Sequence, residues 1–240
     1  MRTVAALCVA GNSVYKSMPW VEAYDARRDA RTFPGGMPVV AHPPCRLWSA
    51  YTKHQAKSDD PEAEKALGLW CASQVRRWGG VLEQPAHSGL WEAAGLPTPG
   101  SSANKPTMFS IEVSQAWWGY PMLKATWLYF HGVEWSSLVF PMNKKPHDSR
   151  AGIGDRRRQQ VMSKNQRAAT YPAFAEWLVA AARSSDLRNH EHGSVRYFRD
   201  GNPVIVGPHD PHYSGAVFCA EEWWLDGRWV TADEVRQAAA

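Results

Sequence analysis

The sequence has little of what marks membrane, secreted or repeat proteins. No apolar run approaches the ~18 residues that span a bilayer, and no internal repeat is visible. The short apolar stretch at the N-terminus stops at Gly11, which favours a strand over a signal peptide. Its four cysteines, Cys8, Cys45, Cys71 and Cys219, lie far apart without a CxxC pair. We therefore expect no disulfide framework, no bound metal and no membrane partner, in a reducing, cytoplasmic setting.

Charge of one sign is in small excess only. The chain has 240 residues, with 27 Lys and Arg against 23 Asp and Glu, and a net charge of +4. This mildly basic balance is compatible with a nucleic-acid partner without requiring one. The hydrophobic fraction of 44% is that of a globular protein that buries a real core. Tryptophan is plentiful, and we expect most of the 13 tryptophans in that core.

Strand and helix signals alternate over residues 1–183. Helical spacing predicts helices over 61–78 and 172–183, the first with Asp60 as its N-cap and Gly79 at its end. Apolar runs predict strands over 3–10, 21–24, 37–41, 81–82 and 125–130. This alternation indicates an α/β domain with a parallel sheet and helices on both faces.

The pattern changes after residue 183. A polar stretch over 184–194 is typical of a linker, and residues 195–240 carry short strand and turn signals. Asp226-Gly227 between two apolar runs predicts a hairpin. We therefore expect a small β-rich C-terminal appendix that closes with a short helix from Ala232.

Three segments with chemical potential fall at the carboxyl ends of predicted strands, where α/β sheets bind ligands. The strand over 37–41 runs into HPPC (42–45), where two prolines end the strand in a rigid loop that displays a cysteine. The strand over 81–82 stops at EQP (83–85), and Lys124 comes just before the strand over 125–130. We expect these segments to be neighbours in space.

Each segment can be interpreted either as functional or as an ordinary structural or solvent-exposed feature. Cys45 can act as a nucleophile if Arg46 and His42, which flank it, favour the thiolate. A desolvated Glu83 can hold or donate a proton to a heterocycle nitrogen, and Lys124 can meet a phosphate or a carbonyl oxygen. Taken singly, the same residues fit a structural cysteine, an exposed turn glutamate and a solvated lysine.

Together the segments resemble the C5-cytosine DNA methyltransferases. The PPCQxxS loop of that family is matched by PPCRLWS (43–49), its Glu-Asn-Val turn by EQP (83–85), and its GVPQxRxR segment by GYPMLKAT (119–126). The 38 positions from Cys45 to Glu83 are similar to the separation in the family. A closer resemblance is to small phage-encoded cytosine-methyltransferase-like proteins with AHPPC, Glu-x-Pro and KAT motifs. The similarity covers residues 3–183.

The resemblance implies a Rossmann-like methyltransferase-type sheet and modification of pyrimidine C5 in DNA, foremost cytosine methylation with S-adenosyl-L-methionine. Cys45 would attack C6 of a flipped-out base, and Glu83 would hold N3 and the exocyclic group. The further base or DNA contacts that it implies are Pro44, Arg46, Ser49, Gln84, Lys124 and Thr126. The cofactor contacts that it implies are Gly11, Asn12, Asp25, Asp29 and Pro43. Lys53 and the arginines at 156–158 are additional candidates for phosphate contacts.

Departures from the family leave alternatives open. Gly11 is the single glycine where the family has a glycine-rich cofactor loop, and Lys124 and Thr126 replace its two arginines. The sequence carries no large target-recognition domain. One alternative is a non-catalytic DNA-binding or decoy protein on a degenerate methyltransferase scaffold. Another is a pyrimidine-nucleotide C5 transferase, and uracil in place of cytosine is a third. If the chain is phage-encoded, its setting is the bacterial host cytoplasm.

Overall fold

A computed structural model describes most of the N-terminal three quarters of the chain and the strands of the remainder. The described residues are 2–49, 58–121, 124–141, 169–186, 195–199, 202–206, 217–219, 222–225 and 228–230. The chain divides into two units, 1–185 and 186–240. Lys53, the arginines at 156–158 and the helix expected from Ala232 lie outside the described residues.

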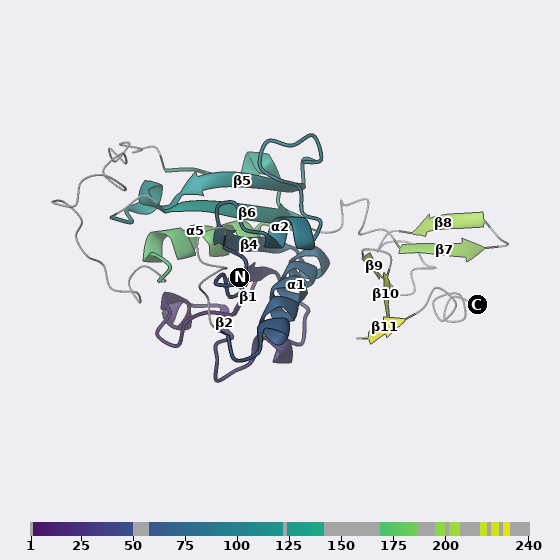
Figure 1. Ribbon diagram of the computed structural model, residues 1–240. Coiled ribbons are helices and arrows are strands. Elements are labelled where there is room, and N and C mark those ends of the chain that lie inside the picture. Colours follow the sequence, from purple (N-terminus) through teal and green to yellow (C-terminus); the bar gives the residue numbers. More distant parts are fainter. Residues whose placement is uncertain are drawn as a thin grey trace. The chain divides into compact units, whose positions relative to one another are not determined.

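The first unit is built on a six-stranded sheet with the order β2-β1-β3-β4-β6-β5 (Figure 1). Its strands are β1 (Val4–Leu7), β2 (Val21–Ala23), β3 (Val39–Ala41), β4 (Gly80–Pro85), β5 (Met108–Ser114) and β6 (Ala125–His131). The first four run parallel, whereas β6 is antiparallel to both β4 and β5. The α/β class is confirmed, and the expectation of a wholly parallel sheet is wrong.

The reversal of β6 follows from the length of the connection before it. Only residues 115–124 separate β5 from β6, and they hold one short 3-10 helix, η3 (Gln115–Trp118). A parallel pair needs a crossover of a dozen or more residues, so the two strands pair antiparallel instead. The strand β5 was not expected from the sequence, although apolar and polar residues alternate strictly over 109–114.

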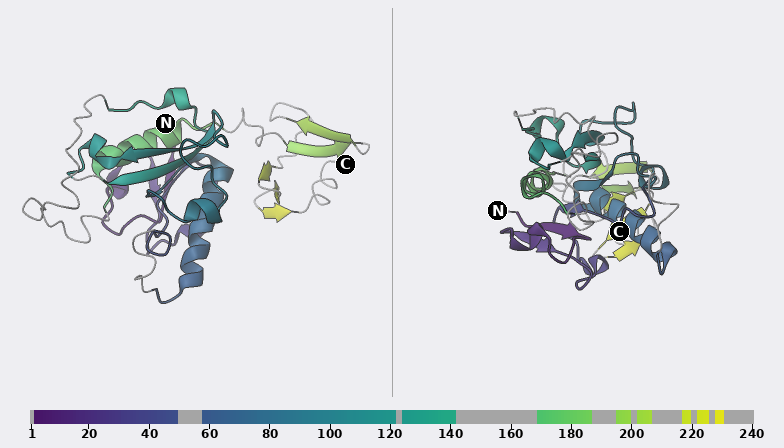
Figure 2. Two further views of the ribbon diagram at one scale, coloured as in Figure 1. Left: turned by 45° about the horizontal axis from the view of Figure 1, so that its top comes forward. Right: turned by 60° about the vertical axis from the view of Figure 1, so that its left-hand side comes forward.

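Helices cover both faces of this sheet (Figures 1 and 2). One face packs against α1 (Pro61–Trp78), through Cys71 and Val75, and the other packs against α5 (Pro172–Arg183). Successive strand residues point to opposite faces, and accordingly Val39 packs toward α1 and Val40 toward α5. Both helices cover the ranges that the sequence predicts.

Short helices occupy several connections of the first unit. They are η1 (Val14–Ser17), η2 (Ala30–Thr32), α2 (Leu90–Ala93) and η4 (Trp135–Ser137). None of the helices in the described parts of the chain combines the length and the apolarity of a membrane span.

The ends of α1 are set by local chemistry. The Asp60 side chain accepts a hydrogen bond from the backbone N–H of Ala63, which caps the first turn as expected. Gly79 ends the helix with a φ of 75°, a backbone conformation that favours glycine. Gly79 also packs against the buried Ser185, so the first unit extends past the expected boundary at 183.

The second unit is described by its strands. The strands β7 (Val195–Arg199) and β8 (Asn202–Val206) pair antiparallel, and β9 (Val217–Cys219), β10 (Glu222–Leu225) and β11 (Arg228–Val230) form a three-stranded antiparallel sheet. Leu225 pairs with Arg228 across Asp226-Gly227, which is the register of the predicted hairpin.

Gly80 controls the contact between β3 and β4. Its φ is 120°, and a Cβ at this position would lie 2.0 Å from the backbone oxygen of Val39. We predict that Gly80→Ala lowers the free energy of unfolding by about 2–5 kcal/mol, because it adds backbone strain to a clash between strands. Gly11→Ala is the matched control, since a Cβ there meets no atom within 4 Å. Urea denaturation measures both, and equal stability of the two variants would contradict this assignment.

Candidate active site

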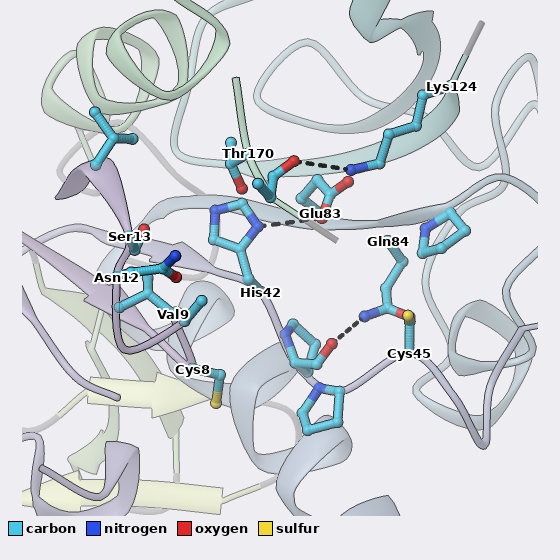
Figure 3. Close-up of a pocket in the computed structure, with 16 residues that line it drawn as sticks. Cys8, Val9, Asn12, Ser13, His42, Cys45, Glu83, Gln84, Lys124 and Thr170 are labelled. Carbon is cyan, nitrogen blue, oxygen red and sulfur yellow. Dashed lines mark hydrogen bonds and ion pairs between the residues drawn. The ribbon is translucent and has the colours of Figure 1, made fainter. Parts of the chain in front are cut away.

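A pocket of about 500 Å³ opens at the carboxyl ends of β1, β3 and β4 (Figure 3). The parallel strands bring their ends to one edge of the sheet, as expected for a ligand site. Many of the expected site residues meet there, while others lie elsewhere. The expected residues that line the pocket are Asn12, Pro43, Pro44, Cys45, Glu83, Gln84 and Lys124.

The sequence suggested that Glu83 lies in a turn after the strand. In the structure Glu83 lies within β4. It pairs with Leu128 of β6, and its carboxylate points into the pocket (Figure 3). Its Oε2 lies 3.1 Å from Nδ1 of His42, and its Oε1 accepts a 3.1 Å hydrogen bond from Nε2 of Gln115. Burial raises the pKa of Glu83, but the hydrogen bonds and the positive charge of Lys124 outweigh burial and leave it below the ordinary value. The resting group is therefore a carboxylate.

His42 connects Glu83 to a buried tyrosine. The Tyr15 hydroxyl lies 2.8 Å from Nε2 of His42, on the opposite side of the ring from Glu83. Burial and the charge of Glu83 both raise the pKa of Tyr15, so it keeps its proton. In the neutral ring, Tyr15 then donates to Nε2, and Nδ1–H donates to Glu83.

Tyr15 was not expected from the sequence, and His42 was expected only as a neighbour of Cys45. Tyr15 lies in η1, and no local pattern distinguishes it from an ordinary core tyrosine. The position of His42 directly after β3 could have identified it, because the parallel pairing of β3 with β4 places that position beside Glu83.

Cys45 is an exposed residue at the pocket. Desolvation of its sulfur and the charge of Glu83 raise the pKa of the thiol, and Lys124 opposes them only in part. The expectation that Arg46 and His42 favour the thiolate is therefore wrong. The Arg46 guanidinium pairs with a carboxylate outside the pocket, and His42 donates to Glu83.

Arg46 fastens the cysteine loop to α1. Its Nε lies 2.8 and 2.7 Å from the two carboxylate oxygens of Glu64, and Ser58 also donates to Glu64. Burial raises the pKa of Glu64, but these partners outweigh it, so the pKa is lowered overall. Arg46, which the resemblance implied as a DNA contact, is thus bound to Glu64 of α1, and the sequence did not indicate this ion pair.

Other implied base contacts also support the loop and the strand ends. Gln84 is buried and donates to the backbone oxygen of Pro43, and its Oε1 accepts a 3.2 Å hydrogen bond from Ser88. The backbone N–H of the buried Ser49 donates to the oxygen of Cys45 at 2.8 Å. The Gln84 bond to Pro43 holds the PPC segment against β4, whereas the Ser49 bond closes the turn that follows Cys45.

Thr126 and Lys124 have different surroundings. Thr126 is fully buried and accepts a 3.2 Å hydrogen bond from Gln115, so it lies behind the pocket wall. The Lys124 ammonium lies 3.4 Å from the backbone oxygen of Ala169 (Figure 3). It also lies 5.4 Å from the centroid of the Tyr120 ring. Lys124 lines the pocket and can meet a carbonyl or phosphate oxygen there.

Three residues implied as cofactor contacts lie outside the pocket lining. Gly11 is exposed beside the pocket. Asp25 pairs with Lys16 and accepts the backbone N–H groups of residues 27 and 28, which together hold its pKa well below the usual range. Asp29 caps η2 and pairs with Arg31. The structure therefore leaves Asn12 and Pro43 as the implied cofactor contacts that reach the pocket.

The charge of Glu83 gives a prediction for the reactivity of Cys45. Because the pKa of the thiol is raised above its ordinary value of about 9, alkylation by iodoacetamide should keep accelerating with pH beyond 9. We predict that Glu83→Gln speeds alkylation of Cys45 at pH 8 roughly 3–10-fold, because it removes the repelling charge. Glu92→Gln, on the exposed side of α2, should change nothing. Peptide mass spectrometry at Cys45 measures the rates, and a wild-type rate that levels off below pH 8 would contradict the prediction.

No protein-family model, curated protein or solved structure matched the chain.

Proposed function

We propose that the chain modifies C5 of a pyrimidine in DNA, foremost by methylating cytosine through a covalent adduct at Cys45. The observation that carries the proposal is that Cys45 and Glu83, 38 positions apart in sequence, line one pocket. A thiol next to a carboxylate has no evident use in a module that only binds. The same pair is what the chemistry of pyrimidine C5 requires.

That chemistry begins at C6 of the base. The C5 carbon becomes nucleophilic when a thiolate adds to C6, because the C5=C6 electrons are then released into the ring. Cys45 forms the S–C6 bond and Glu83 interacts with N3 and the exocyclic group. After C5 has taken up the new carbon, loss of its proton and cleavage of the S–C6 bond restore the ring. Since attack comes at the ring face, the base must leave the duplex stack.

The charges of the free site fit a mechanism in which the Cys45 thiolate forms only after a base has bound. Desolvation and, after it, the ionised Glu83 raise the pKa of Cys45, so the free site holds a thiol. A bound base that hydrogen-bonds with Glu83 weakens this repulsion, while Lys124 lowers the pKa of the thiol. Binding therefore promotes the thiolate that the reaction consumes.

The part of the pocket next to β1 suits a donor such as S-adenosyl-L-methionine, which supplies the methyl group when bound. The Asn12 amide and the Ser13 hydroxyl offer hydrogen bonds, and Val14 and Pro43 offer apolar contact. These residues would hold the donor in place of the expected Asp25 and Asp29, whose carboxylates are bound to Lys16 and Arg31.

A non-catalytic DNA-binding protein on the same scaffold is the second candidate. The raised pKa of Cys45 and the occupied carboxylate of Asp25 favour it, because neither residue then serves the reaction at rest. A pyrimidine-nucleotide C5 transferase would use the same pocket residues on a free nucleotide. Activity on dCMP with none on DNA would identify that enzyme.

The proposal predicts a new nucleoside in cells that express the protein. Nucleosides from their DNA should include a C5-modified pyrimidine, whose mass identifies the added group. Cys45→Ser should abolish it, because a serine hydroxyl is a poor nucleophile for C6. Cys71→Ala, a buried position on α1 outside the pocket, is the control that should retain it. Equal amounts of the nucleoside with and without Cys45 would overturn the proposed function.

The donor assignment predicts a specific loss of binding. Asn12→Ala should weaken S-adenosyl-L-methionine binding by about tenfold, the effect of losing one good hydrogen bond. Asp29→Asn, outside the pocket, should change the Kd by less than about twofold. Isothermal titration calorimetry measures both Kd values. A larger loss of affinity in Asp29→Asn than in Asn12→Ala would contradict the assignment and indicate that Asp29 binds the donor.

A further inference from the structure

Methylation of cytosine requires a proton that the resting site does not hold on Glu83. The N3 atom of cytosine carries no hydrogen, and it gains electron density when a thiolate adds to C6. A carboxyl group at N3 must therefore donate a proton to it. In the structure Glu83 is a carboxylate that accepts hydrogen bonds at both oxygens. Its proton must come from a neighbour.

Two described side chains donate to Glu83. One is the Gln115 amide, whose Nε2 lies 3.1 Å from Oε1 and which cannot release a proton. The other is His42, whose Nδ1 lies 3.1 Å from Oε2. Both carboxylate and imidazole are nearly enclosed, with side-chain exposures of 12% and 11%. His42 is therefore the titratable group with a direct path to Glu83.

We propose that His42 supplies Glu83 with the proton that Glu83 presents to N3 of cytosine, and that Tyr15 fixes the ring for this transfer. This inference rests on the proposed function and assigns a role to a residue that lies one position before the PPC segment. His42 acts through Glu83, so it is a positioning residue that also carries a proton.

The proton transfer balances with the covalent step. The imidazolium N–H bond at Nδ1 breaks as an O–H bond forms at Oε2 of Glu83. The Cys45 thiol releases its proton to solvent, and its thiolate forms the S–C6 bond. The C5=C6 electrons shift to C4–C5, and the C4=N3 electrons take the proton from Glu83. When the S–C6 bond breaks, the proton returns from N3 to Glu83 and then to His42.

Tyr15 makes both ring states possible. Its hydroxyl oxygen accepts from Nε2–H of the imidazolium, and its hydroxyl hydrogen is donated to Nε2 of the neutral Nδ1–H ring. The hydroxyl thus keeps Nδ1 directed at Glu83 in either state. The titratable groups that contact the ring are Tyr15 from η1 and Glu83 from β4, and those that line the same pocket are Cys8, Cys45 and Lys124.

Uracil provides an internal comparison, because it does not need this proton. Its N3 already carries a hydrogen, and addition at C6 places negative charge on O4, which the Lys124 ammonium can meet. Loss of a proton donor behind Glu83 should therefore impair addition to cytosine more than addition to uracil. A residue that only supports the fold would impair both equally.

Exchange of the C5 hydrogen tests the inference without a methyl donor, since addition at C6 makes that position exchangeable. The full chain is incubated in heavy water with single-stranded oligonucleotides that contain either cytosine or uracil, and mass spectrometry follows deuterium at C5. The decisive variant is His42→Gln, whose amide can still donate to Glu83 but cannot protonate it. We expect cytosine exchange to fall on the order of 100-fold more than uracil exchange, as for loss of an acid catalyst.

The matched control is His131→Gln. His131 is also a buried histidine paired with a tyrosine, with its Nδ1 3.0 Å from the Tyr129 hydroxyl, but it lies at the other end of the sheet, outside the pocket lining. Its cytosine-to-uracil ratio should match that of the wild type.

Three outcomes are distinguishable. Equal losses on the two bases in His42→Gln, or no loss on cytosine, would overturn the role of His42 while the proposed function stands. Exchange that is absent from the wild type, or unchanged in Cys45→Ser, would overturn the proposed function itself, and the role of His42 with it. A selective loss on cytosine supports both.

Discussion

The parallel pairing of β3 with β4 brings together the two groups at the centre of the pocket, His42 and Glu83. Ala41 is in register with Leu82, so the next residue on each strand, His42 and Glu83, lie side by side and hydrogen-bond directly. A shift of one residue would turn Glu83 toward the opposite face of the sheet. The close approach of the two strands depends in turn on Gly80, where a side chain would strike the β3 backbone. The site is thus a consequence of strand register more than of loop conformation.

The chemistry of the pocket follows from a balance between desolvation and charge. Burial alone would favour a neutral Glu83, yet hydrogen bonds from His42 and Gln115 and the charge of Lys124 keep it ionised. Desolvation and this same charge raise the pKa of Cys45 and keep its thiol protonated. A base that takes up this charge changes both groups together. The coupling explains why the nucleophile and the carboxylate belong in one pocket, and why Lys124 lies beside them.

Much of this arrangement was predictable from the sequence. The apolar runs, the Asp60 cap and the proline-ended strand predict the sheet edge at which Cys45 and Glu83 meet. The direction of β6 was not predictable from its own residues, because it depends on the short connection from β5. The partners of Arg46 and Asp25 were hidden for a related reason. Each depends on a side chain brought close by packing, from α1 in the first case and η1 in the second. Periodicity identifies elements, whereas ion pairs require their positions in space.

The most direct test of the central claim is the mass of a covalent complex between the protein and DNA. An oligonucleotide with 5-fluorocytosine in place of cytosine is incubated with the full chain and S-adenosyl-L-methionine. Fluorine at C5 cannot leave as a proton, so a productive reaction is trapped at the adduct. The account predicts a complex with the summed mass of protein, DNA and one methyl group, with the attachment mapped to the peptide that contains Cys45. An attachment at any other residue, or no complex with a folded protein that binds the donor, would contradict it.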